Sequence, residues 1–126
     1  MGKQLQVQSH TKHNPLLPGT LEMLVLRILA EGPMHGYGIA QSISDLSGHV
    51  LGVTEGSLYP ALSRLLKQGW AAAEWGVSEN KRRARFYSLT AAGRKQLGIE
   101  RESFGRVIGA IARIMQAPNG RHSAKS

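Results

Sequence analysis

Apolar residues recur at helical spacing between Thr54 and Gln68, in the stretch TEGSLYPALSRLLKQ. The leucines of this stretch are Leu58, Leu62, Leu65 and Leu66. Their spacing places them on one face of a helix, which is typical of an element that packs against a core. The stretch therefore predicts an amphipathic helix, around which the rest of the chain can be interpreted.

The opposite face of this helix offers hydroxyl and cationic groups. Its members are Ser57, Pro60, Ser63, Arg64 and Lys67. Such donors, with small neighbours that do not hold a backbone away from a duplex, suit the phosphates and base edges of nucleic acid. One interpretation is a recognition helix that enters a DNA groove, and the other is an ordinary core helix with a solvated basic face.

The start of this helix has two candidate caps. If Thr54 is the N-cap, Pro60 lies beyond the first turn, where a proline removes a backbone donor and crowds the carbonyl four residues earlier. If Ser57 is the cap, Pro60 falls among amides that have no partner within the helix anyway. In both cases we expect an irregular first turn.

Two further helices are predicted before this stretch. Residues 21–31 form a run with a continuously apolar middle, which predicts contact on more than one side; Gly19 or Thr20 caps it and Gly32-Pro33 stops it. Residues 36–46 form the second helix. Its inward residues are predicted to be Ile39, Ile43 and Leu46, and its outward residues Gln41 and Asp45.

The glycines at the start of the second helix, Gly36 and Gly38, do not form a dinucleotide-binding fingerprint, because Gln41 stands where a third glycine is required. They predict close packing of this helix against its neighbours. The backbone amides there can also meet a DNA phosphate, to which His35 and Tyr37 would donate. A purely structural role for His35 is the alternative.

A β-hairpin is predicted after the amphipathic helix. Gly69 ends that helix, residues 70–75 form a first strand, residues 76–81 a turn, and residues 83–89 a second strand. The tip of the hairpin is basic, with Lys81, Arg82, Arg83 and Arg85. Guanidinium groups on an arm suit the negative potential of a narrow minor groove, and a solvated charged loop is the alternative.

The C-terminal part of the chain predicts a long helix over residues 91–116, capped by Thr90. Its apolar stripe is broader than one small domain can cover, so we expect it to pack on a second copy. The stripe consists of Leu97, Phe104, Val107, Ile108, Ile111, Ile114 and Met115. Gly105 and Gly109 weaken the helix by about 1 kcal/mol each but permit close helix approach.

The 126 residues, 41% of them hydrophobic, suffice for one compact domain. A formal net charge of +8 predicts an anionic partner, with nucleic acid as the first candidate and an acidic membrane surface as the second. No apolar run is long enough to span a bilayer or to form a leader peptide, so we expect a cytoplasmic protein. The absence of cysteine excludes disulfides and thiolate chemistry.

Other chemistries find little support. His10 and His13 have no third ligand nearby in sequence, so no metal site is expected. His35, Asp45 and Ser57 are the residue types of a nucleophilic triad, but no nucleophile elbow surrounds Ser57, so neither catalysis nor a cofactor is expected. The polar segments 1–14 and 117–126 predict flexible tails.

Four motifs occur in order over residues 17–97: LPGTLEMLVLRIL, HGYGIAQSI, TEGSLYPALSRLLKQGW and EWGVSENKRRARFYSLTAAGRKQL. Together they resemble the PadR family of bacterial winged-helix transcriptional regulators, in its short form. The resemblance implies a repressor that binds operator DNA as a homodimer and, in many members, releases it when a small molecule binds. It also implies that residues 57–60 form the recognition-helix motif, residues 81–85 the wing, and residues 87–90 the closing strand and cap.

The fold class expected from these elements is α+β, mainly helical with a small β-hairpin. Residues 15–90 are predicted to form a winged helix-turn-helix domain, and residues 91–116 a dimerisation helix. The cations of the amphipathic helix and wing would bind phosphates, and Ser57, Tyr59, Pro60 and Arg64 would select bases. A dimer then requires a palindromic site with half-sites about one helical turn apart. A non-specific architectural binder with the same surface is the alternative.

In relatives, the resemblance implies an effector between the subunits, sandwiched by aromatic side chains. Here both tryptophans, Trp70 and Trp75, lie in the hairpin, and Phe104 is the one aromatic residue of the C-terminal helix. We therefore expect Phe104, Val107 and Ile108 to line a small cavity at the dimer interface, or simply to pack there.

Overall fold

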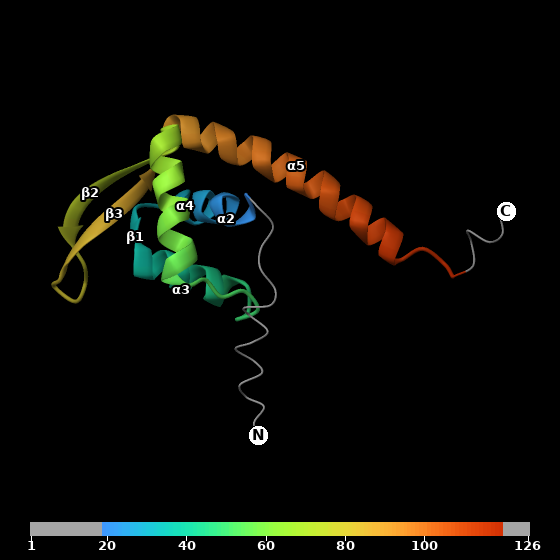
Figure 1. Ribbon diagram of the computed structural model, residues 1–126, viewed down its shortest axis with the longest axis horizontal. Helices are drawn as coiled ribbons and strands as arrows, with labels where there is room; N and C mark the ends of the chain where they lie inside the picture. Colours follow the sequence, from blue (N-terminus) through green and yellow to red (C-terminus); the bar gives the residue numbers. More distant parts are fainter. Residues whose placement is uncertain (1–18, 120–126) are drawn as a thin grey trace, which may run out of the picture.

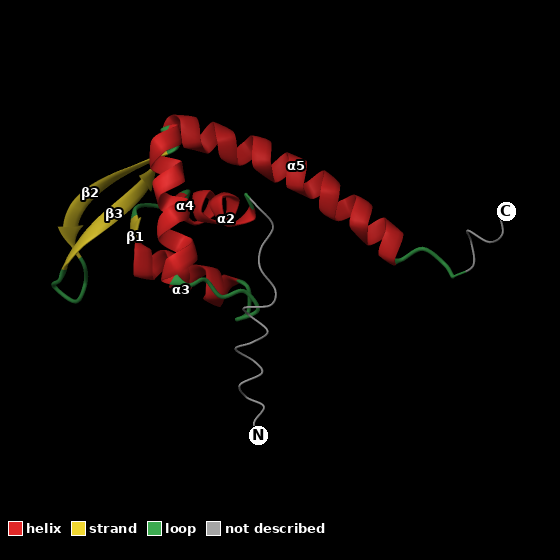
Figure 2. Cartoon of the chain, in the orientation of Figure 1, coloured by secondary structure: helices red, strands yellow, loops and turns green. Residues whose placement is uncertain are grey.

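The structure, a computed structural model, describes residues 19–119. The tail predicted over residues 1–14 and most of that predicted over residues 117–126 lie outside the described residues. The described elements are α2 (Thr20–Leu29), β1 (Met34–His35), α3 (Gly36–Leu46), α4 (Glu55–Gln68), β2 (Ala71–Val77), β3 (Arg83–Leu89) and α5 (Ala91–Met115). Helices α2, α3 and α4 pack together, the β2–β3 hairpin projects on one side, and α5 extends away on the other (Figure 1). Figure 2 shows the predicted α+β architecture, mainly helical with a small sheet.

Helix α2 forms the centre of the core. Six of its ten residues are buried, and it contacts α3, α4, α5 and β3, which confirms the predicted contact on more than one side. Gly19 caps it, with a left-handed φ of 87°. The helix ends at Leu29 instead of Glu31, because the chain tightens there into hydrogen bonds from Glu31 N to Ile28 O and from Gly32 N to Leu29 O.

Helix α3 has the predicted bounds and buries Ile39 and Ile43. The prediction that Leu46 faces inward is wrong, because its side chain is 76% exposed. Leu46 continues the apolar stripe, but it is the last residue of the helix, and Val50 in the loop that follows is equally exposed. The apolar stripe of α3 therefore extends beyond the residues of the core, and its last member, Leu46, has nothing to pack against.

Helix α4 begins after Thr54, whose Oγ1 accepts a hydrogen bond from Ser57 N at 3.2 Å. This settles the choice of cap in favour of Thr54 over Ser57. The helix is continuous through Pro60, and its first turn combines an i→i+3 bond from Ser57 N to Thr54 O at 3.1 Å with an i→i+4 bond from Leu58 N to the same oxygen at 2.9 Å, so the departure from a regular α-helix is confined to this one bond. Leu58, Leu62 and Leu65 are buried as predicted, with Leu66 partly buried beside them.

The sheet has the order β1-β3-β2 and is antiparallel throughout. Strand β3 has the predicted bounds, but β2 runs to Val77, two residues further than predicted, because Gly76 and Val77 still pair with Ala84 and Arg83. The turn therefore lies beyond Val77 instead of starting at Gly76. Strand β1 was not predicted, since two residues are too few for a sequence pattern.

Helix α5 is fastened to the body, residues 20–89, at its first turn. The Thr90 hydroxyl accepts a hydrogen bond from Gly93 N at 3.0 Å, as a cap, and donates one to Gly69 O at 2.7 Å. A Cβ at Gly93 would lie 2.0 Å from Trp70 O, so only glycine permits this approach. Beyond Leu97 no residue of α5 is fully buried.

Within residues 19–119, no helix combines the length and apolar character needed to cross a bilayer. In the same part of the chain, no three His, Cys, Asp or Glu side chains gather closely enough to hold a metal ion. His10 and His13 lie outside the described residues.

Candidate nucleic-acid interface

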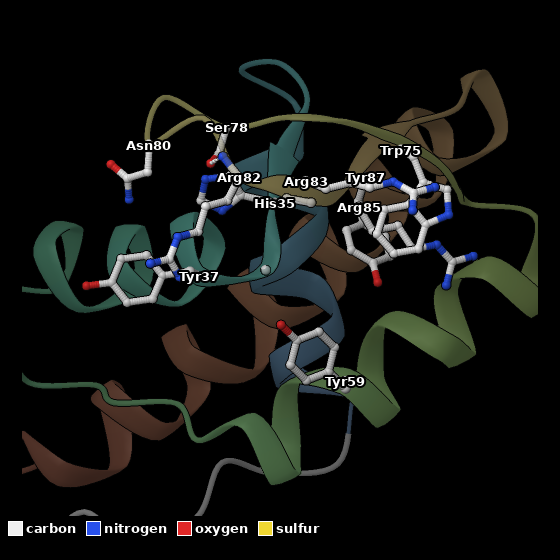
Figure 3. A pocket seen from close by; sticks show the side chains of 12 residues that line it. His35, Tyr37, Tyr59, Trp75, Ser78, Asn80, Arg82, Arg83, Arg85 and Tyr87 are labelled. Atoms are coloured by element: carbon white, nitrogen blue, oxygen red, sulfur yellow. Dashed lines mark hydrogen bonds between the residues drawn. The ribbon is translucent and has the colours of Figure 1, made fainter.

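A cleft of about 590 Å³ opens between the hairpin, the start of α3 and one flank of α4 (Figure 3). We call the hairpin of β2, its turn and β3 the wing, residues 71–89. The lining residues are His35, Gly36, Tyr37, Tyr59, Trp75, Ser78, Asn80, Arg82, Arg83, Ala84, Arg85 and Tyr87. The cleft thus brings together predicted DNA-binding residues from three separate parts of the sequence.

His35 has a structural role at the N-terminus of α3. Its Nδ1 accepts a hydrogen bond from Gly38 N at 3.0 Å, and its ring meets the ring of Phe86 edge-on at 5.4 Å between centroids. The structural alternative for His35 therefore has direct support. The predicted phosphate contact remains a proposal for its other ring nitrogen.

Tyr59 of α4 packs against the first turn of α3. A Cβ at Gly36 would lie 2.6 Å from the Tyr59 hydroxyl oxygen, which shows the close packing predicted for this glycine. Burial, followed by the nearby Glu55 and Tyr87, raises the pKa of the Tyr59 phenol. A phenol is protonated at neutral pH even at its ordinary pKa of about 10, so this hydroxyl can donate a hydrogen bond.

Two wing arginines lie over aromatic rings. The Arg83 guanidinium carbon is 4.5 Å from the centroid of Trp75, and that of Arg85 is 5.8 Å from the centroid of Tyr87. Cation–π contacts at exposed sites contribute about 0.5–1 kcal/mol each. They limit the positions that these two charges occupy, so the cations are held on the face that lines the cleft.

Backbone hydrogen bonds close the wing turn. Ser78 N donates to Arg82 O and Lys81 N to Ser78 O, both at 2.8 Å. Lys81 has a positive φ of 60°. The turn therefore has a defined shape that presents Lys81 and Arg82, both exposed, at its tip.

The outward face of α4 carries most of the remaining predicted residues. Ser57, Pro60, Ser63 and Lys67 are all exposed. Arg64 differs from them, because its Nε donates to a carboxylate oxygen of Glu22 in α2. Five helical residues separate Tyr59 from Arg64, which is about 140° around the axis, so the two lie on opposite flanks of α4.

Some residues of this surface were not predicted. Trp75, Ser78 and Asn80 line the cleft, and Glu22 binds Arg64 from 42 residues away in sequence. A prediction that extended β2 to Val77 would have placed Trp75 opposite Arg85 in the strand register, where the structure has it. No sequence signal could have paired Glu22 with Arg64, because the contact depends on how α2 crosses α4.

The residues predicted for the dimer interface and effector site lie on α5. Val107, Ile108, Ile111 and Met115 are exposed, and Phe104 is partly buried against the core. The stripe therefore faces solvent along most of its length, which leaves it available for a second chain.

A helix pair, α3 and α4, followed by a basic wing defines the winged helix-turn-helix class. Within this class, residues 25–99 match the Transcriptional regulator PadR-like family, and the chain belongs to that family. The family resemblance drawn from the four sequence motifs is thereby confirmed. The family is one of transcriptional regulators, and it indicates no enzymatic activity.

Individual relatives agree with this assignment. A 37.1 kDa protein encoded in transposon Tn4556 of Streptomyces fradiae is 44% identical over 90 residues, which is 71% of this chain but only 24% of that protein's length. A PadR-like transcriptional regulator from Bacillus cereus has a TM-score of 0.68 at 26% identity, covering 79% of this chain and 95% of that one. Bacillus subtilis PadR in complex with operator DNA has a TM-score of 0.56 at 24% identity, covering 63% and 45%, a similarity of fold.

Proposed function

We propose that the protein is a sequence-specific, homodimeric repressor that binds a palindromic operator through α4 and the wing. The observation that carries the proposal is the cleft that joins one flank of α4 to the basic wing, so that the two elements form one continuous surface. A recognition helix in the major groove with an adjoining arm on the minor groove is a common docking geometry.

The charges of this surface fit a polyanion. The wing carries four cations, Lys81, Arg82, Arg83 and Arg85, against the two carboxylates Glu74 and Glu79. Lys67 adds a cation on α4. Such a surface releases counterions from DNA when it binds, so the affinity falls steeply as salt rises.

We assign distinct roles along the surface. Ser57, Pro60, Ser63 and Lys67 face the major groove, with Arg64 at a base edge on the flank that faces α2. Arg82 and Arg83 enter the minor groove, and Tyr37 and His35 approach a phosphate. Bacillus subtilis PadR, which shares the winged-helix fold, has been solved in complex with operator DNA, and this supports DNA as the partner.

Dimerisation is assigned to residues 91–116, which contain α5, and DNA binding to residues 15–90. The exposed apolar stripe of α5 supports this division, since a two-fold interface would remove the stripe from water. Phe104, Val107 and Ile108 are proposed to line an effector cavity at that interface. A thermal-shift screen with phenolic and cationic aromatic compounds tests the cavity, and the absence of any hit favours simple packing.

Selection of bound sequences from a random DNA pool tests the main proposal. We expect a palindrome with half-sites about one helical turn apart. The affinity for the selected sequence should exceed that for random duplex by at least about a thousandfold at physiological salt. A ratio near one would instead favour an architectural binder that uses the same cations without sequence choice.

A further inference from the structure

Tyr59 lies apart from the other proposed base-reading residues of α4. Its ring stands on the flank that faces α3 and the wing, whereas Ser57 and Arg64 lie about 160° and 140° around the helix axis from it. Figure 3 shows the Tyr59 hydroxyl pointing into the cleft, with no hydrogen bond to the other residues drawn. A hydroxyl in this position is turned away from the middle of the surface that would lie along base edges.

Tyr59 is 46% exposed, but its hydroxyl end packs against the first turn of α3. The oxygen lies so close to Gly36 that a methyl group there would be only 2.6 Å away. The phenol is protonated at neutral pH, and burial with the neighbouring Glu55 raises its pKa further from that range. The result is a pre-positioned neutral donor on one wall of the cleft.

The opposite wall is cationic. Arg82, Arg83 and Arg85 line the cleft from the wing, and a guanidinium that lies over a ring still has N–H donors in its own plane. At about 590 Å³, the cleft has room for a phosphodiester with its adjoining sugars. A neutral donor facing guanidinium donors across such a space matches the oxygens of one anionic phosphodiester.

We infer that this cleft is a binding site for one backbone phosphodiester of DNA, held by the Tyr59 hydroxyl from α4 and by a wing guanidinium from the other wall. The inference rests on the proposed DNA binding and moves Tyr59 from base selection to phosphate anchoring. A phosphate held by both elements fixes the wing relative to the recognition helix. Such a contact positions the protein on any sequence and selects none.

The test compares the full-length wild-type chain with Tyr59→Phe, which keeps the ring and removes the donor. We expect Tyr59→Phe to lower the affinity about tenfold for the selected operator and for random duplex alike. The selected sequence should stay the same. A change in the selected bases would show that Tyr59 reads a base edge and would overturn the inference, as would an unchanged affinity.

A second measurement locates the phosphate. Each backbone phosphate of the operator is replaced in turn by a neutral methylphosphonate. One position in each half-site should weaken the wild type more than it weakens Tyr59→Phe, because the variant has already lost the Tyr59 contact and keeps only the guanidinium contact to that phosphate. If every position weakens both proteins equally, Tyr59 contacts no phosphate and the inference fails.

Two further variants serve as controls. Ser57→Ala also removes a hydroxyl from α4, but about 160° around the helix axis from Tyr59, so it should not couple to the methylphosphonate that couples to Tyr59→Phe. Gly36→Ala keeps every donor and displaces the Tyr59 ring, so it should reproduce the uniform loss, with circular dichroism to confirm folding. If the wild type itself does not prefer the operator, the proposed repressor function fails, whereas the uniform loss of Tyr59→Phe on random duplex still tests the phosphate contact.

Discussion

Apolar side chains are mostly buried in the body of the molecule, residues 20–89, but mostly exposed in α5. The body buries the leucines and isoleucines of α2, α3 and α4 against one another, as Leu26, Ile39 and Leu65 show with no exposed surface. In α5 only Gly93 and Leu97 are fully buried, Phe104 is partly buried against the core, and the rest of the apolar stripe faces solvent. The body therefore supplies its own core, while α5 presents half of an interface.

The way α5 is attached to the body would determine how a dimer places its two α4 helices. The Thr90 hydroxyl joins the end of α4 to the start of α5 through Gly69 O and Gly93 N. Because α5 begins in a fixed direction, pairing two copies along α5 would also fix the separation of their two α4 helices. The half-site spacing of an operator would then follow from the geometry of this junction.

The largest effect of a single substitution on stability is expected inside the body. Leu26→Ala should lower the free energy of unfolding by roughly 2–5 kcal/mol, because the cavity forms in a fully packed site. Leu46→Ala removes the same side chain at an exposed position and should change it by less than about 0.5 kcal/mol. Urea denaturation followed by circular dichroism measures both. Equal losses would mean that Leu46 is buried in solution, against the structure.

The next largest effect is expected at the junction. Gly93→Ala places a methyl group against Trp70 O and should cost about 2–3 kcal/mol of stability. Gly98→Ala, in the same helix but with open space around it, should instead raise stability by up to about 1 kcal/mol. Thermal melts of the two variants give the contrast. A tolerated Gly93→Ala would show that α5 is loosely attached.

A third prediction concerns the exposed apolar stripe of α5, which we expect to form the dimer interface. Ile111→Asp should weaken the dimer at least tenfold, or about 1.4 kcal/mol, because a carboxylate would be buried without a partner. The melting temperature of the body should not change. Arg106→Asp adds the same side chain about 140° around α5 and should leave the dimer intact. Sedimentation equilibrium distinguishes the two, and a dimer that survives Ile111→Asp would place the interface elsewhere.

A smaller effect is expected from the caps. Thr90→Val should cost about 1–2 kcal/mol, because it removes both hydrogen bonds of the hydroxyl. Thr54→Val removes the corresponding cap of α4, whose hydroxyl donates only to the exposed Ser57 hydroxyl of the same turn, and should cost about 1 kcal/mol or less. Chemical denaturation ranks the two losses. The reverse order would show that the Gly69 contact contributes nothing.

The smallest effect is expected at the tip of the wing. Arg82→Ala should weaken binding to all sequences alike and reduce the slope of log affinity against log salt by about 1. Gel-shift titrations at several salt concentrations measure the slope. An unchanged slope would remove Arg82 from the DNA contact and leave the body to bind through α4 alone.

Local patterns were predictable where a residue acts through its own neighbours in sequence. The leucine spacing of α4, the Gly69 end of that helix and the Thr90 cap of α5 were all found as expected. The inward assignment of Leu46 failed because helical periodicity identifies a face but not where the neighbouring helices end. Strand β1 was missed because its pairing with β3 brings together residues more than 50 positions apart.

The sequence alone determined the order of the elements, the basic wing and the apolar stripe of α5, since periodicity, turn residues and charge are read along the chain. Tertiary structure decided which side chains meet: Glu22 with Arg64, Gly36 with Tyr59, and the wing arginines with their aromatic rings. These contacts join elements whose crossing is set by the packing of the whole core. For that reason the division of α4 into an outward face and a cleft-facing flank appears only in the folded protein.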